Sequence, residues 1–199
     1  MKNKTFQEII EEIKNVDQSK FDSVGEELRL VDELTDPEYL YEILDYLDTR
    51  FQENIKISYL LVHRVLGKGM VAASVPLLLE LLRRYEDLDI KLKLIDALGE
   101  IGSNYGAEIL INYAEHPDSR LRGAASWALG EIKWQRAKKV LIKNLEDEDA
   151  VVRRCATRAL GNLGDKKVIP HIKKSLQKEK NKSTMEDMEK AIEYLESLY

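Results

Sequence analysis

Three stretches of the chain repeat one pattern: Ile95-Asp-Ala-Leu-Gly-Glu-Ile-Gly102, Ser126-Trp-Ala-Leu-Gly-Glu-Ile-Lys133 and Thr157-Arg-Ala-Leu-Gly-Asn-Leu-Gly164. The alanines at positions 97, 128 and 159 are 31 residues apart both times. A fixed period of this size is typical of a solenoid, in which short units stack side by side because none buries its apolar face alone. These stretches therefore decide the fold class.

Each unit predicts two helices. An aspartate suited to N-capping (Asp87, Asp118, Asp149) precedes a first helix whose apolar residues recur three or four apart, such as Ile90, Leu94 and Leu98. The alanine and glycine near its end are small enough to let the next helix approach closely. A short turn then leads to a second amphipathic helix. Four repeats result, at 55–86, 87–117, 118–148 and 149–179.

Both ends of the chain depart from this pattern. Residues 1–54 predict helices at 6–15, 22–34 and 37–48, which we interpret as N-terminal capping helices or a degenerate repeat. Residues 184–199 predict a C-terminal capping helix that begins at the capping box Ser183-Thr-Met-Glu186. Its methionines could alternatively form an adaptable binding groove. With only four prolines and ten glycines, the whole chain is expected to be all-α.

The fourth copy, Asp149-Ala-Val-Val-Arg-Arg-Cys-Ala-Thr-Arg-Ala-Leu-Gly-Asn-Leu-Gly164 with Val168-Ile-Pro170 behind it, closely resembles the HEAT-like repeat of the phycobilisome bilin lyase type. The resemblance covers residues 55–179. It implies an α-solenoid, a right-handed superhelix of helical hairpins with helical caps, whose second helices line the concave side. It says less about function, because one repeat type serves many activities.

Composition restricts the function classes. The net charge is −5, but residues 1–54 carry fifteen acidic and six basic side chains, whereas the rest of the chain is net positive. The single cysteine, Cys155, excludes an internal disulfide and a multi-cysteine metal site. The chain shows neither a membrane span nor a signal-peptide core, so a cytoplasmic location is expected.

Enzymatic chemistry finds little support. Deoxyhypusine hydroxylase resembles this repeat type but binds di-iron through His-Glu pairs, and none of His63, His116 and His171 is followed by glutamate. No spacing indicates a nucleophile with its base, and Gly67-Lys-Gly69 is more simply a helix-ending turn than a phosphate loop. We therefore predict no catalytic residue, metal or cofactor.

The second helices are expected to supply the binding surface. Their non-core positions turn from mixed or acidic in the second repeat to basic in the third and fourth, which would suit an acidic partner or would merely be solvated. Trp127 is a further candidate anchor, because the equivalent residues Asp96 and Arg158 are charged and exposure is expected there. Trp134 falls in an inter-helix turn. The predicted partner-binding residues are Glu80, Arg83, Glu108, Asn112, Trp127, Lys139, Lys143, His171 and Lys174.

We predict a non-enzymatic scaffold that binds a protein partner on the concave face. One version is an adaptor, or an acidic toxin antagonist whose N-terminal carboxylates at Glu26, Glu27, Asp32 and Glu33 mask a basic partner. The alternatives are a tetrapyrrole-handling protein similar to bilin lyases and a nucleic-acid-binding protein. Overall acidity and the few aromatics near the lysines argue against nucleic acid, and the oligomeric state stays open.

Overall fold

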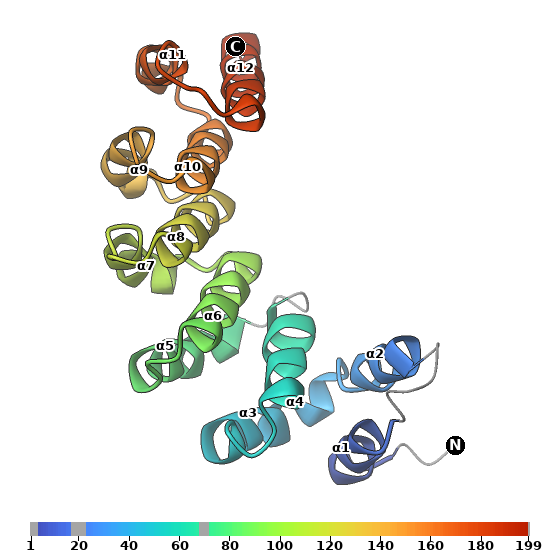
Figure 1. The fold of residues 1–199 in the computed structure, drawn as a ribbon. Coiled ribbons are helices and arrows are strands. Elements are labelled where there is room, and N and C mark those ends of the chain that lie inside the picture. Colours follow the sequence, from blue (N-terminus) through green and yellow to red (C-terminus); the bar gives the residue numbers. More distant parts are fainter. Residues whose placement is uncertain (1–3, 17–22, 68–71, 199) are drawn as a thin grey trace.

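A computed structural model describes residues 4–16, 23–67 and 72–198. Within these ranges the chain is helical throughout and contains no strand. Figure 1 shows two rows of helices that follow one another along a curved stack. The predicted α-solenoid is thus confirmed.

The first row contains the helices that carry the Ala-Leu-Gly pattern and their equivalents. They are α2 (Ser23–Glu33), α4 (Ile55–Leu60) with its π-helical continuation η2 (Leu61–Gly67), α6 (Leu88–Ile101), α8 (Ser119–Glu131), α10 (Ala150–Leu163) and α12 (Lys182–Ser197).

The second row contains the shorter helices between them. They are α1 (Phe6–Lys14), α3 (Leu40–Arg50), α5 (Val75–Arg84), α7 (Ala107–Tyr113), α9 (Lys138–Asn144) and α11 (Ile169–Leu176). From α3 onward a 3₁₀ turn precedes each one, namely η1 (Pro37–Tyr39), η3 (Ala72–Ser74), η4 (Asn104–Gly106), η5 (Gln135–Ala137) and η6 (Lys166–Val168).

The aspartates predicted to cap the first helices do so. Asp87 accepts hydrogen bonds from the backbone N–H groups of Asp89 and Ile90, and the side chains of Asp118 and Asp149 each accept one from the residue two positions on. These bonds satisfy N–H groups that have no partner within the helix. At α12 the cap is Asn181 rather than Ser183, so that helix begins two residues before the predicted start.

Glycine and alanine hold neighbouring first helices together. A Cβ atom added at Gly99 would lie 2.9 Å from Ala128 Cα, and one at Gly130 would lie 2.6 Å from Ala159 Cα. Only a residue without a side chain permits this approach. The Ala-Leu-Gly stretch therefore joins the helices of consecutive repeats, as its small residues predicted.

The direction of the bend differs from the expectation. In Figure 1 the first-row helices α4, α6, α8, α10 and α12 lie on the inner side of the arc, and the second-row helices α3, α5, α7, α9 and α11 lie on the outer side. The first helices pack closely along the stack, whereas neighbouring second helices touch only lightly. The row with the closer spacing must be the inner one, so the first helices line the concave face.

The core runs without interruption between the two rows. Ile90, Leu94 and Leu98 of α6 turn toward the second helices and are buried, and the equivalent residues of α8 and α10 continue the same ladder. Because a helix turns 100° per residue, residues 92, 96 and 100 point the opposite way, toward the concave side. The register of each first helix therefore fixes which residues a partner could reach there.

The C-terminal helix stands where a further first helix would stand. Ala191 of α12 lies against Gly161 as Ala159 lies against Gly130. Met188, Ile192 and Leu195 of this helix are buried against the stack. The residue equivalent to the contact glycine is the exposed Glu193.

One inter-helix turn carries an unfavourable residue. Gly102 and Gly164 end their first helices with φ of 70° and 69°, and the equivalent Lys133 has φ of 56°. A side chain in this left-handed region costs on the order of 1 kcal/mol relative to glycine.

The glycine contacts predict unequal effects of the same substitution. Gly130→Ala should lower the free energy of unfolding by about 1–3 kcal/mol, because the added methyl collides with the backbone of Ala159. Gly161→Ala is the matched control, since its methyl would meet only Ala191 Cβ at 3.6 Å. The control should be neutral or stabilising by up to about 1 kcal/mol. Urea unfolding followed by circular dichroism measures both, and equal losses would contradict the packing described here.

Lys133→Gly should raise the free energy of unfolding by about 1 kcal/mol, because glycine adopts the observed φ without strain. Thermal unfolding measures the change. A neutral result would show that the loop adapts to lysine at no cost.

Candidate interaction surfaces

The predicted partner-binding residues other than Trp127 lie on the second helices, on the outer side of the bend. We call the surface that they form the outer strip. Of its residues, Glu80, Arg83, Glu108, Asn112 and Lys139 are exposed on the second row of helices, as expected for a surface. Their place on the concave face is wrong, because that face belongs to the first helices. The resemblance had implied that the second helix of each pair lines the concave face.

The C-terminal part of this strip is hollowed. A cleft of about 640 Å³ separates the ends of α7 and α9 from α11, and Lys143, His171 and Lys174 line it together with Glu115 and Glu146. The structure thus brings three of the predicted residues into one site. The cleft arises because neighbouring second helices splay apart on the outer side of the arc.

Carboxylates neutralise the lysines of this cleft. Lys143 Nζ lies 2.9 Å from Glu115 Oε1, and Glu146 Oε1 receives both Lys174 at 3.4 Å and Lys178 at 3.6 Å. These two lysines lower the pKa of Glu146 below its ordinary value. Further along the strip, Arg136 and Glu108 lie 3.3 Å apart. The basic gradient of the sequence is therefore largely compensated from repeat to repeat.

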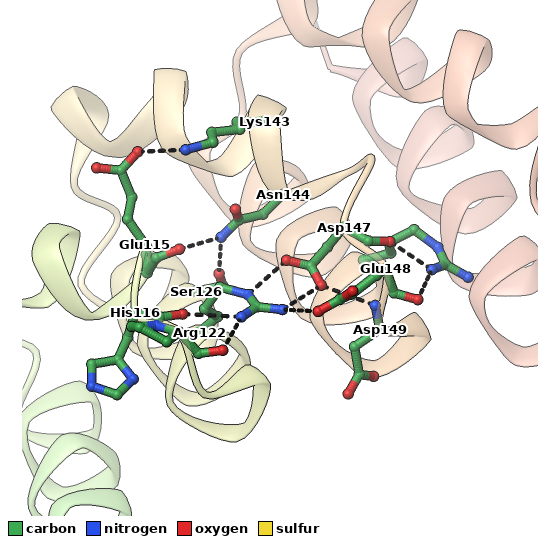
Figure 2. Close-up of polar contacts among 12 residues, drawn as sticks. Glu115, His116, Arg122, Ser126, Lys143, Asn144, Asp147, Glu148 and Asp149 are labelled. Atoms are coloured by element: carbon green, nitrogen blue, oxygen red, sulfur yellow. Dashed lines mark hydrogen bonds and ion pairs between the residues drawn. The ribbon is translucent and has the colours of Figure 1, made fainter.

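The wall of the cleft contains a buried side-chain amide. Asn144 is buried, and its Nδ2 donates to the carbonyl of Ala114 at 2.9 Å and to Ser126 Oγ at 3.0 Å. Figure 2 shows the second of these bonds reaching across to α8. Asn144 thus joins α9 to the end of α7 in the preceding repeat and to α8 in its own repeat, which is a structural role.

Arginine clamps lie behind the cleft. In Figure 2 the Arg122 guanidinium faces Asp147, with Nε–Oδ2 at 2.7 Å and Nη2–Oδ1 at 2.8 Å. Its Nη1 donates to the carbonyl groups of His116 and Pro117. The next repeat copies this arrangement, since Arg153 bonds Glu179 through two nitrogens. The Asp-x-x-Val/Leu-Arg pattern was the available sequence signal for these clamps.

Glu179 is the most strongly perturbed of these groups. Its side chain is 1% exposed and accepts from Arg153 and from the backbone N–H groups of Asn181 and Lys180. Despite burial, which acts in the other direction, the hydrogen bonds from Arg153 lower the pKa of Glu179 to about 2. The carboxylate therefore stays ionised and fastens the start of α12 to α10.

The concave face presents a different surface, which we call the concave strip. It consists of the first-helix residues that point away from the second helices at equivalent positions. These are Asp89, Leu92, Asp96 and Glu100 of α6, Arg120, Gly123, Trp127 and Glu131 of α8, and Val151, Arg154, Arg158 and Asn162 of α10.

Trp127 stands in the middle of the concave strip. The expectation that it is exposed is wrong, because its side chain is half-buried, with ring atom Cζ3 only 2.9 Å from the point where a Gly99 Cβ would lie. The missing side chain of Gly99 makes room for the ring between α6 and α8. Along α10, Val151 is 57% exposed and Cys155 is half-buried. The concave strip thus presents apolar side chains on α8 and α10 among its charged residues.

Trp134 lies in the turn after α8, as predicted, and its ring is half-buried against the core. The Arg136 guanidinium lies 5.4 Å from the ring centroid, a distance at which cation–π attraction operates. The equivalent Ser103 and Asp165 cap the following turn with their side chains, whereas Trp134 does not. This tryptophan covers the junction between repeats.

The groups that could do chemistry have other roles. His116 Nδ1 accepts the Asp118 N–H at 3.0 Å, and burial raises the pKa of the Cys155 thiol, which disfavours the reactive thiolate. The His63 side chain and residues 68–69 of the glycine-rich stretch lie outside the described residues. Within the described residues 4–16, 23–67 and 72–198, we find no group of histidine, cysteine and acidic residues able to hold a metal ion. No described helix is long and apolar enough to cross a membrane.

A family model described as HEAT repeats matches residues 75–152 and 107–193, together more than half of the chain. The chain belongs to the HEAT-repeat family. The model describes HEAT repeats in general, so the bilin lyase subtype stays a prediction. No curated protein matches the chain.

Solved structures similar to this HEAT-repeat chain include engineered solenoids. A designed armadillo repeat protein in complex with the peptide (KR)4 has a TM-score of 0.68 at 16% identity, covering 96% of this chain and 100% of that one. An engineered protein has a TM-score of 0.65 at 20% identity, covering 96% and 97%. At these identities the likeness concerns the fold alone.

The Arg153–Glu179 clamp predicts a loss of stability in acid. Because the pKa of Glu179 is lower in the folded state than its ordinary value of 4.5, the stabilisation is complete above pH 4.5 and disappears as the pH falls toward about 2. Glu179→Gln should remove about 3 kcal/mol at neutral pH and flatten this dependence. Urea unfolding between pH 7 and pH 3 measures both effects. The matched control is Glu148→Gln, an 87% exposed carboxylate near Arg122, which should change stability little.

Proposed function

We propose that this HEAT-repeat protein is a non-enzymatic scaffold that binds a protein partner on its concave strip. The observation that carries the proposal is the position of Trp127. A tryptophan occupies the centre of a face where the equivalent residues are Asp96 and Arg158. Tryptophan buries a large area at low entropic cost and is enriched among the residues that dominate binding energy.

The surroundings of Trp127 support this role. Its ring is half-buried and therefore held in place by Gly99, and the exposed Val151 adds apolar area on the next helix. Charged residues border this centre on both sides along the concave strip. An apolar centre with a charged rim is the usual anatomy of a protein–protein interface.

The outer strip is a second candidate surface, supported by the 640 Å³ cleft that contains Lys143, His171 and Lys174. Its weakness is electrostatic. Each ion pair across the cleft would have to be broken or shared before a charged partner could bind.

The alternative functions have less support. Nucleic acid requires uncompensated basic side chains, whereas the lysines of the outer strip face glutamates of the preceding repeat. For the toxin-antagonist version, Asp32 forms two hydrogen bonds to Arg64, and Glu33 pairs with Arg29. The side chains of Glu26 and Glu27 lie outside the described residues. Two of the four carboxylates proposed to mask a basic partner are thus used within the fold.

Trp127→Arg tests the proposed surface. Arginine is the residue of the equivalent position in α10, so the fold should persist, whereas the affinity for the native partner should fall by about tenfold or more. The partner is first isolated by pull-down from the native source, and calorimetry then compares the purified variants. Circular dichroism checks the fold.

The controls are Lys139→Glu and His171→Ala, two exposed residues of the outer strip. They should bind the partner as the unaltered protein does. If these controls lose affinity and Trp127→Arg retains it, the partner binds the outer strip and the proposal for the concave strip fails.

A further inference from the structure

The concave strip has a surplus of positive charge at its C-terminal end. Arg154 and Arg158 of α10 both face one carboxylate, Asp187 of α12, with Nε–Oδ2 distances of 3.7 Å and 2.7 Å. Asp187 is 13% exposed, whereas Arg154 and Arg158 are 38% and 56% exposed. Two guanidinium groups thus share one partly buried carboxylate, and both arginine side chains remain partly exposed.

One donor in this group has no acceptor. Arg154 Nε is buried and makes no hydrogen bond to any described residue, since Asp187 is too far away to accept one. A guanidinium donates in a planar fork, and a carboxylate is the group that matches this geometry best. Because Nε itself is inaccessible, an incoming carboxylate would approach the exposed part of the Arg154 side chain, which is 38% exposed as a whole.

Apolar surface lies beside these arginines. On a helix, residues three and four apart share a face, so Val151 adjoins Arg154 and Cys155, and Arg158 follows one turn later. Trp127 occupies the position equivalent to Arg158 on the neighbouring helix α8. A ligand carboxylate on the arginines would therefore place an adjoining apolar group near Val151 and Trp127.

The opposite end of the strip carries the opposite charge. Asp89, Asp96 and Glu100 of α6 lie on the far side of Trp127 from the arginines. Such an arrangement attracts an acidic segment to α10 and repels it from α6, which fixes its orientation. Charge complementarity thus identifies both the sign of the bound segment and the end at which it binds.

We propose that the concave strip recognises an acidic segment of the partner, with an aspartate or glutamate side chain on Arg154 and Arg158 and a neighbouring apolar side chain on Trp127 and Val151. This inference rests on the proposed function and adds the chemistry of the partner. It differs from the outer strip, where Lys143 and Lys174 face Glu115 and Glu146 of the preceding repeat.

The test compares two labelled octapeptides, the acidic EELEELEE and the basic KKLKKLKK, by fluorescence anisotropy at low ionic strength. The acidic peptide should bind about tenfold more tightly, and Arg154→Glu with Arg158→Glu should reverse this order. Because that double variant places two new carboxylates beside Asp187, Arg158→Gln serves as a milder variant. It should lower the affinity for the acidic peptide about threefold or more and leave the helical circular dichroism unchanged.

Arg136→Glu is the matched control, because Arg136 is 77% exposed on the outer side. It should leave the preference for the acidic peptide unchanged. Equal binding of the two peptides, or an equal loss with Arg136→Glu and Arg158→Gln, would overturn the proposal.

The Trp127→Arg variant distinguishes failure of the acidic-segment proposal from failure of the proposed concave binding surface. If it abolishes binding of the native partner while the acidic peptide has no advantage, the concave scaffold stands and only the acidic segment is wrong. If it affects neither the partner nor the peptide, the concave strip is not the binding site and both proposals fail.

Discussion

The contact between glycine on one first helix and alanine on the next is the constraint on which this architecture depends. Gly99 against Ala128 and Gly130 against Ala159 bring backbones closer than any side chain would permit. Because the second helices are not drawn together in this way, the stack shortens along one row and bends toward it. The same small residues thus determine the connection between repeats, the curvature and the helices that line the concave face.

Ion pairs and hydrogen bonds between consecutive repeats also stabilise this stack. The Arg122–Asp147 and Arg153–Glu179 clamps recur one repeat apart and also satisfy carbonyl groups of the inter-repeat turns. Outer-row lysines find carboxylates on the preceding repeat. A charged surface that is neutralised internally loses much of its value for recruiting a partner, since those pairs must be disturbed on binding. The concave strip is therefore the better candidate for binding a partner.

Three features of the concave strip support its proposed role. Trp127 is held by its contact with Gly99, Val151 offers exposed apolar surface, and Arg154 and Arg158 share a single carboxylate. Each of these features results from a departure at a position where the copies of the repeat disagree. In a solenoid the framework residues are repeated, so residues that depart from the repeat are the ones on which the proposed binding surface rests.

The sequence by itself determined the helical repeat, its period of 31 residues, the aspartate caps and the close approach at glycine, because these depend on local hydrogen bonds and on side-chain size. It also identified Trp127 as unusual. Only the tertiary structure decided which row is concave, because curvature is a difference in spacing between two rows and neither row reveals it alone. The same holds for Lys143 and Lys174, whose charge is compensated by Glu115 and Glu146 from the preceding repeat. Lys143 and Glu115 are 28 residues apart in the chain, and only the stacking of repeats brings them together.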